Sequence, residues 1–150
     1  MLLEGFQVKR ALKEDSAAIK KIVEDLDLSY KGFEVSDFFV GKLDGKIVAI
    51  ARVQAFDDIL FLTCVGVIEK YQGRGIAKAF LEKLTAIHKD KDIYLNTVIP
   101  EFFQKLGFHS LDLLDPSLSE LVKTLPPKKL FNCEECFPER CRFMVKRGEK

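Results

Sequence analysis

Residues 65–78 read Val65-Gly66-Val67-Ile68-Glu69-Lys70-Tyr71-Gln72-Gly73-Arg74-Gly75-Ile76-Ala77-Lys78. An apolar strand leads into a glycine-rich turn, and the turn leads directly into an amphipathic helix. The first N–H groups of a helix have no partner inside the helix and lie at the positive end of its dipole. Gly73 and Gly75 carry no side chain, so the backbone can approach a ligand closely. The segment therefore predicts a site for phosphate groups.

The spacing of these glycines excludes two common phosphate-binding loops. The G-x-x-x-x-G-K-[ST] loop of nucleoside triphosphatases does not occur in the chain. The dinucleotide pattern G-x-G-x-x-G begins at Gly73, but Lys78 replaces its third glycine, and Asp92 precedes the next strand instead of ending it. For the loop taken alone, a glycine turn that binds nothing is the simple alternative.

Two segments together resemble one family. The pattern Gln72-x-x-Gly75-x-Ala77 is similar to the acyl-CoA pyrophosphate loop of the GNAT N-acetyltransferases, written [QR]-x-x-G-x-[GA]. Phe102–Phe108 resembles the family's later motif, an aromatic residue followed by x-x-x-Gly-Phe, and the resemblance extends from Gln7 to Leu113. It implies an α/β (α+β) fold, with a mixed, mostly antiparallel twisted sheet of about six to seven strands and helices on both faces. It also implies an acetyl-CoA-dependent N-acetyltransferase.

The composition is that of an ordinary globular chain. Its 150 residues match the commonest domain size, so we expect residues 1–150 to form a single domain. The resemblance implies that this is an acyl-CoA N-acyltransferase domain. The net charge of +1 gives no reason to expect nucleic acid, and no apolar run is long enough to span a membrane. We expect a cytoplasmic protein that binds neither. The oligomeric state stays open, with a homodimer among the forms considered.

Apolar periodicity predicts the elements around the loop. Asp44-Gly45 is a strong hairpin signal between two apolar runs, and Pro100 stands where proline is tolerated at a helix start. We expect helices beginning near residues 14, 76 and 100, and a short helical stretch at 118–123. Strands are expected at residues 7–11, 38–43, 46–53, 59–67, 93–96, 108–113 and 142–145.

The resemblance implies which residues bind acetyl-CoA. In the GNAT fold the pantetheine arm pairs with the strand before the loop, and a bulge in that strand frees an N–H for the thioester oxygen. Carried onto this chain, the backbone of Val65 and Val67 would contact the arm, with Asn96 and Phe103 beside the cosubstrate. The pyrophosphate would be surrounded by Gln72, Gly73, Arg74, Gly75, Ile76, Ala77 and Lys78.

Acid and base residues are harder to assign. Acetyl transfer needs a neutral amine, donors for the oxyanion, and stabilisation of the departing thiolate. Many family members have Tyr where this chain has Phe103, which cannot donate a proton, so Tyr94 or water would have to act as the acid.

Candidate bases are Glu69, Thr63 and Cys64, with a water chain as the alternative. Glu69 also fits a solvated loop carboxylate, and a nucleophilic Cys64 would create a covalent route. Since alternate strand positions face opposite sides, we expect only one of Thr63 and Cys64 to face the acceptor pocket.

The acceptor is expected to be the amine of a small molecule, such as the amino acid glutamate, or of a peptide. The Phe102-Phe103 pair, with residues 95–97 upstream and a cysteine-bearing loop at 125–141 before the last strand, resembles the branch of N-acetylglutamate synthases. An α-carboxylate needs a cation in the pocket, and Arg10 and Arg52 on predicted strands are candidates, although strand arginines more often lie on the surface. A CoA-binding or regulatory module without chemistry is the alternative function, supported by Phe103.

Three of the four cysteines are close in sequence, at Cys133, Cys136 and Cys141. One pair plus one cysteine is weaker than the two spaced pairs typical of zinc sites, so we expect no metal. Free thiols, a zinc site and a disulfide all stay open as interpretations.

Overall fold

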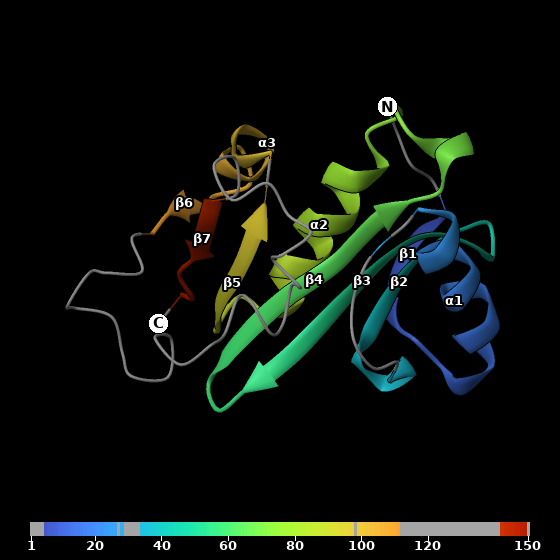
Figure 1. The fold of residues 1–150 in the computed structure, drawn as a ribbon, viewed down its shortest axis with the longest axis horizontal. Helices are drawn as coiled ribbons and strands as arrows, with labels where there is room; N and C mark the ends of the chain where they lie inside the picture. The colour runs from blue at the N-terminus through green and yellow to red at the C-terminus, as the bar shows by residue number, and fades with distance from the viewer. Residues whose placement is uncertain (1–4, 27, 29–33, 98, 112–141, 150) are drawn as a thin grey trace.

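The computed structural model describes residues 5–26, 28, 34–97, 99–111 and 142–149 (Figure 1). Its strands are β1 (Phe6–Arg10), β2 (Phe38–Leu43), β3 (Lys46–Phe56), β4 (Ile59–Val67), β5 (Asp92–Thr97), β6 (His109–Ser110) and β7 (Arg142–Lys146). Its helices are α1 (Ser16–Asp25), α2 (Ile76–Ile87) and α3 (Pro100–Gln104), with the 3₁₀ turns η1 (Lys13–Asp15), η2 (Val35–Asp37) and η3 (Glu69–Tyr71).

The described strands form one sheet in the order β1-β2-β3-β4-β5-β7-β6. Neighbouring strands are antiparallel in every pair except β4–β5, which is parallel. The hairpin between β2 and β3 turns at Asp44 and Gly45, whose φ angles of 51° and 81° are those that a two-residue hairpin turn requires. The predicted mixed, mostly antiparallel sheet is therefore confirmed.

The two longer helices cover opposite faces of this sheet, because neighbouring residues on a strand point to opposite sides. Phe38, Val40 and Ile50 pack against α1, whereas Phe39, Ala49 and Ala51 pack in the cluster that contains the buried residues of α2. The helices thus lie on both faces, as the resemblance implied. We refer below to the α1 face and the α2 face of the sheet.

Strands β4 and β5 are paired over only three residues each. Ile59, Leu60 and Phe61 lie opposite Asp92, Ile93 and Tyr94, and the pairing ends there. Beyond this point the two strands diverge, which Figure 1 shows as a V between β4 and β5. The sheet is therefore split on one side of β4, next to the loop quoted at the start.

Some predicted elements differ from the structure. β6 is only two residues long, and Leu111 beyond it is in no strand, so the predicted strand at 108–113 was too long where the structure describes it. Their helical spacing predicts that Ile76, Phe80, Leu84 and Ile87 form the apolar stripe of α2. The first three are buried, but Ile87, at the last position of that helix, is 52% exposed. The predicted stretch at 118–123 and the cysteine-bearing loop at 125–141 lie outside the described residues. In the described part, no helix is long and apolar enough to cross a membrane.

Candidate active site

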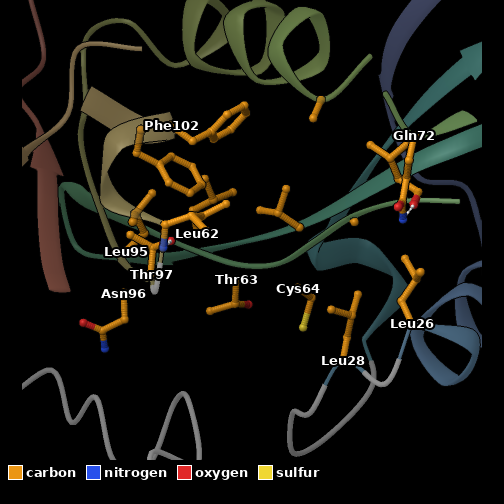
Figure 2. Close-up of a pocket in the computed structure, with 16 residues that line it drawn as sticks. Leu26, Leu28, Leu62, Thr63, Cys64, Gln72, Leu95, Asn96, Thr97 and Phe102 are labelled. Atoms are coloured by element: carbon orange, nitrogen blue, oxygen red, sulfur yellow. Dashed lines mark hydrogen bonds between the residues drawn. The ribbon is translucent and has the colours of Figure 1, made fainter. Parts of the chain in front are cut away.

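A cavity of about 610 Å³ occupies the place where β4 and β5 part. Most of its wall is apolar, and its few polar side chains come from the two diverging strands and from Gln72 of the glycine loop (Figure 2). Such a cavity suits a long, partly apolar ligand held by a small number of polar contacts. The residues that line it are Leu26, Leu28, Leu62, Thr63, Cys64, Val65, Gly66, Val67, Gln72, Ala77, Leu95, Asn96, Thr97, Ile99, Phe102 and Phe103.

A β-bulge lies in β4 at the centre of this cavity. Ile50 pairs with Gly66 and Arg52 pairs with Thr63, so β4 contains one more residue than β3 over this span. Cys64, inside the bulge, has a φ of 51°, a left-handed conformation that is rare for a residue with a side chain. The bulge expected from the family resemblance is present, and the strained backbone at Cys64 marks the site as a candidate for function.

The bulge changes which way the side chains of β4 point. Thr63 and Cys64 both point to the α1 face, where Cys64 packs against the cluster around α1, whereas Val65 packs on the α2 face (Figure 2). The prediction that only one of Thr63 and Cys64 faces the pocket was therefore wrong. Strict alternation fails here because the inserted residue shifts the two-residue repeat by one position.

The glycine loop forms a backbone cradle at the start of α2. The first helical bond runs from the N–H of Ala79 to the carbonyl of Gly75 at 3.1 Å, so the N–H groups of residues 76–78 have no acceptor within the helix. Gly73 and Gly75 both have φ angles of 78°. A Cβ on either glycine would meet no described atom within 4 Å, so the surface over the loop is open. This geometry suits an anion at the helix start.

Some side chains of the loop hold its conformation, and others place positive charge beside it. The amide Nε2 of Gln72 donates to the carbonyl of Val67 at 2.9 Å, which ties the loop back to the end of β4 (Figure 2). The side chain of Ile76 is buried in the core, so only its backbone is available to a ligand. Arg74 lies 5.5 Å from the centre of the Tyr71 ring, and Lys78 is 3.9 Å from Glu82. Both cations are exposed beside the cradle.

Three polar side chains of the cavity, those of Thr63, Cys64 and Asn96, point to the α1 face. Asn96 of β5 points to the same side as Thr63 and Cys64 (Figure 2). Burial raises the pKa of the Cys64 thiol above its ordinary value, while the Thr63 hydroxyl and the Arg52 guanidinium lower it by smaller amounts. Cys64 is therefore a protonated thiol at neutral pH, which weakens it both as a base and as a nucleophile.

Arg52 lies on β3, next to the polar side chains of β4. It is 6% exposed, lies opposite Thr63 in the strand register, and places Nη2 3.5 Å from the carboxylate Oδ2 of Asp37. The predicted surface position for a strand arginine thus does not apply to Arg52. The Asp37 carboxylate balances this buried charge, and Arg52 is not among the residues that line the cavity.

Three other residues considered from sequence lie outside the cavity lining. Glu69 is exposed on η3. Arg10 is exposed on β1, where its guanidinium donates to the Ser36 carbonyl at 3.0 Å and lies 5.0 Å from the centre of the Phe39 ring. The Tyr94 hydroxyl accepts from Arg147 Nη1 at 3.1 Å, and Tyr94 does not line the cavity. Burial raises the pKa of Tyr94, with Arg147 lowering it by a smaller amount.

Phe103 lies in the wall of the cavity, among three aromatic rings. It is 6% exposed and meets Phe102 edge to face with ring centroids 5.1 Å apart, and Phe108 in the same way at 5.6 Å. The motif at 102–108 therefore closes the α2 face of the cavity, together with the buried side chains of Leu62 and Leu95.

Sequence reasoning missed the contribution of the segment after α1. Leu26 and Leu28 line the cavity, and a Cβ placed on Gly66 would lie 2.6 Å from Leu26 Cδ1 and 3.2 Å from Leu28 Cδ1. A glycine inside a strand is a known signal for the close approach of another segment, and Gly66 carries that signal. The identity of the approaching segment is a long-range property that local patterns do not contain.

Comparisons with known proteins agree with this geometry. The sequence profile of the Acetyltransferase (GNAT) domain matches residues 34–110, which is more than half of the chain. The protein belongs to the GNAT family. The matched span of this GNAT domain runs from η2 to β6, so it contains the split between β4 and β5, the bulge and the glycine cradle.

Solved structures resemble the GNAT domain over nearly its whole length. N-acetylglutamate synthase from Neisseria gonorrhoeae, complexed with coenzyme A and L-arginine, matches with a TM-score of 0.71 at 17% identity, covering 97% of this chain and 34% of that one. Rv2747 from Mycobacterium tuberculosis, in a complex that contains CoA, has a TM-score of 0.71 at 21% identity and covers 94% and 98% of the two chains. Arabidopsis thaliana Naa50, with the bisubstrate analogue CoA-Ac-MVNAL, has a TM-score of 0.65 at 15% identity over 95% and 98%. The chain spans about a third of the length of the N-acetylglutamate synthase structures that it matches.

Proposed function

We propose that this GNAT domain is an acetyl-CoA-dependent N-acetyltransferase that passes the acetyl group directly to a bound amine. The observation that carries the proposal is the cavity between β4 and β5, which continues to an anion-binding cradle at the start of α2. Coenzyme A has an extended arm and a diphosphate, so it matches both parts of this site. Coenzyme A or a CoA bisubstrate analogue is present in the three similar structures named above, which supports the same cosubstrate here.

In this proposal the diphosphate binds the free N–H groups of residues 76–78, with the loop backbone at residues 72–75 around it. Arg74 and Lys78 add positive charge at the surface. The pantetheine arm runs along the open edge of β4 past Val67 and Val65, taking the place that a longer β5 would otherwise fill. Asn96 and Phe103 line the facing side.

The chemistry places three demands on the site. The amine must lose a proton before or during attack, the carbonyl oxygen must be stabilised as it becomes an oxyanion, and the thiolate must leave. We propose that a backbone N–H freed at the bulge holds the thioester oxygen. Among the described lining residues, none is a carboxylate or a histidine. We therefore propose that water carries the amine proton to solvent, where Glu69 is exposed, and that the thiolate leaves without a phenol donor.

The acceptor that we propose is a small amine bearing a carboxylate, with the N-terminus of a peptide as the second candidate. Arg52, opposite Thr63 in the strand register, is the buried cation next to the lining residues. We propose that its guanidinium attracts an anionic group near the amine, in competition with the Asp37 carboxylate. Similar proteins include an N-acetylglutamate synthase complexed with N-acetyl-glutamate, which supports the amino acid, and the peptide-analogue complex of Naa50, which supports the peptide. Arg10 pairs with Phe39 of β2, which is not a lining residue, whereas Arg52 pairs with Thr63, so Arg10 is not our candidate.

The test follows thiol release from acetyl-CoA in the presence of the protein and a panel of amines: the L-amino acids, spermidine and the pentapeptide Met-Val-Asn-Ala-Leu. Turnover that depends on the amine supports the proposal, and preference for an acidic amino acid supports the role given to Arg52. A raised melting temperature with acetyl-CoA, but no turnover with any amine, would favour an inactive CoA-binding module instead. No thermal shift with acetyl-CoA would remove both functions.

A further inference from the structure

Thr63 presents a buried hydroxyl that the fold itself does not use. The residue is 6% exposed. Its Oγ1 is one of the buried side-chain oxygen and nitrogen atoms that have no hydrogen-bond partner in the described part of the chain. The thiol of Cys64, a weak partner, is the polar group beside it. An unsatisfied buried hydroxyl destabilises a protein, and valine has nearly the same shape without that penalty. Threonine at this position therefore needs an explanation other than stability.

The position of Thr63 relative to Asn96 provides one. Phe61 and Tyr94 are the last residues paired between β4 and β5. If the parallel register continued, Thr63 would lie opposite Asn96, two residues further along each strand. Both side chains line the cavity and point to the α1 face (Figure 2). They stand on the two diverging strands, two residues beyond the last pair, so a ligand inserted between the strands lies beside both.

The walls of the cavity determine from which face an acceptor can approach that point. On the α2 face the parting strands are closed by Leu62, Leu95 and Phe103, which are 3%, 2% and 6% exposed. The polar side chains of Thr63 and Asn96 point to the α1 face instead. An amine that attacks a thioester lying between the strands must therefore come from the α1 face, past Thr63 and Asn96.

A neutral primary amine has one lone pair and two N–H groups. Attack requires the lone pair to point at the thioester carbon, so the N–H groups must be held by acceptors on the opposite side. Thr63 Oγ1 and Asn96 Oδ1 can each accept one N–H. We propose that Thr63 and Asn96, facing each other across the split strands, hold the two N–H groups of a primary-amine acceptor. This inference rests on the proposed acetyl-transfer function and adds the residues that select the acceptor.

The experiment compares Thr63→Val, Thr63→Ser and Thr97→Val with the unsubstituted chain. Thr97 is a matched control: it is 9% exposed, lines the same cavity, and its Oγ1 accepts the N–H of Ile99 at 3.0 Å. We expect Thr63→Val to keep or raise the melting temperature, and Thr97→Val to lower it, because only Thr97 has a hydroxyl with a structural partner. A loss of melting temperature in Thr63→Val as large as that in Thr97→Val would overturn the inference.

The kinetic part uses the best acceptor from the amine panel and its N-methyl derivative. We expect Thr63→Val to raise the KM for the amine about tenfold, which corresponds to about 1.4 kcal/mol, with the KM for acetyl-CoA unchanged. Thr63→Ser, which keeps the hydroxyl, should restore the original value. The unsubstituted chain should prefer the primary amine over the N-methyl derivative, and Thr63→Val should reduce that preference.

The outcomes separate the two proposals. Equal amine KM values for Thr63→Val and the unsubstituted chain, while both turn over, would overturn the role of Thr63 and leave acetyl transfer intact. No turnover of any amine by the unsubstituted chain would overturn the acetyl-transfer function, and this inference with it.

Discussion

Gly73 and Gly75 allow the loop before α2 to adopt left-handed backbone angles. Both have φ angles of 78°, and a Cβ on either would meet no described atom within 4 Å. A substitution at either glycine therefore tests the cost of the backbone conformation alone, because the added side chain does not clash with a neighbour. An L-residue with a Cβ is strained in this left-handed region, with asparagine the least affected.

We therefore expect Gly75→Ala to lower the free energy of unfolding by about 1–2 kcal/mol. Gly75→Asn should cost less, because asparagine tolerates the left-handed region. Urea denaturation measures both, and calorimetry with acetyl-CoA should show weaker binding in the same order as the cradle distorts. Equal losses in the two variants would contradict the conformational explanation.

Cys64 should react slowly with alkylating reagents at neutral pH. Burial raises the pKa of its thiol, so the reactive thiolate is scarce at pH 7 and increases about tenfold per pH unit until the pH reaches that raised pKa. We expect iodoacetamide labelling of Cys64 to accelerate in this way between pH 7 and pH 9. Peptide-resolved mass spectrometry measures it separately from Cys133, Cys136 and Cys141.

Acetyl-CoA should protect Cys64 from this reagent, because the thiol lines the cavity proposed for the cosubstrate. Fast labelling already at pH 6 would contradict the raised pKa. A Cys64→Ser variant that retains turnover would agree with a neutral thiol that is not the nucleophile.

At the residue scale, local pattern predicted the glycine cradle but not the orientation of the side chains in the bulge. The loop glycines could be recognised because they and the helix that follows them are adjacent in sequence. The common orientation of Thr63 and Cys64 depends on one extra residue relative to β3, which alternation within β4 alone cannot reveal. The burial of Arg52 depends on Asp37 and the α1 face, which only the assembled sheet brings together.

At the element scale, the segment after α1 and strand β4 make an unusually close contact. Gly66 leaves room for Leu26, whose Cδ1 would lie 2.6 Å from a Cβ at that position. Because the contacting atom is the end of a side chain, the overlap can be relieved by movement of Leu26 or by its truncation.

We expect Gly66→Ala to lower the free energy of unfolding by about 1–3 kcal/mol, the usual effect of overpacking. The same substitution in a Leu26→Ala background should cost clearly less. A double-mutant cycle by urea denaturation measures the difference, which reports the coupling between the two residues. Additive effects would show that the helix end does not press on β4 at Gly66.

Most elements could be predicted from sequence because their signals are local. The Asp44-Gly45 turn, the apolar runs of β2 to β4 and the apolar stripe of α2 each lie within one short window of sequence. The order of the strands is a different matter. β7 pairs with β5 and β6 on either side, and β4 parts from β5 beside the packed rings of Phe102 and Phe103. Neither the strand order nor the parting of β4 from β5 can be inferred from the sequence of a single segment.

At the scale of the whole molecule, the last described strand is essential to the sheet. β7 lies between β5 and β6, and its Phe143, Met144 and Val145 are 6%, 0% and 0% exposed. Burial of three such side chains contributes on the order of 5–9 kcal/mol, at about 1.5–3 kcal/mol each. That is comparable to the whole stability of a typical domain.

A chain that stops after residue 141 is therefore expected not to reach a cooperative folded state. A chain that stops after Lys146 is the control, since it keeps β7 and loses the ion pair between Arg147 and Asp92, which are 3.2 Å apart. The control should fold with a modestly lower melting temperature. Circular dichroism during heating measures both chains, and a sharp transition in the shorter one would contradict this role for β7.

The location of β7 also determines when the protein can become active during its synthesis. Strands β1 to β4 and the glycine cradle precede β5 in the chain and can pair as soon as they are made. β5 gains its second neighbour only when residues 142–146 have been translated, some fifty positions later. Until then, one wall of the cavity has an open edge. A nascent chain can thus form the cradle early, yet the cavity wall at β5 gains its second strand neighbour only after residues 142–146 have been made.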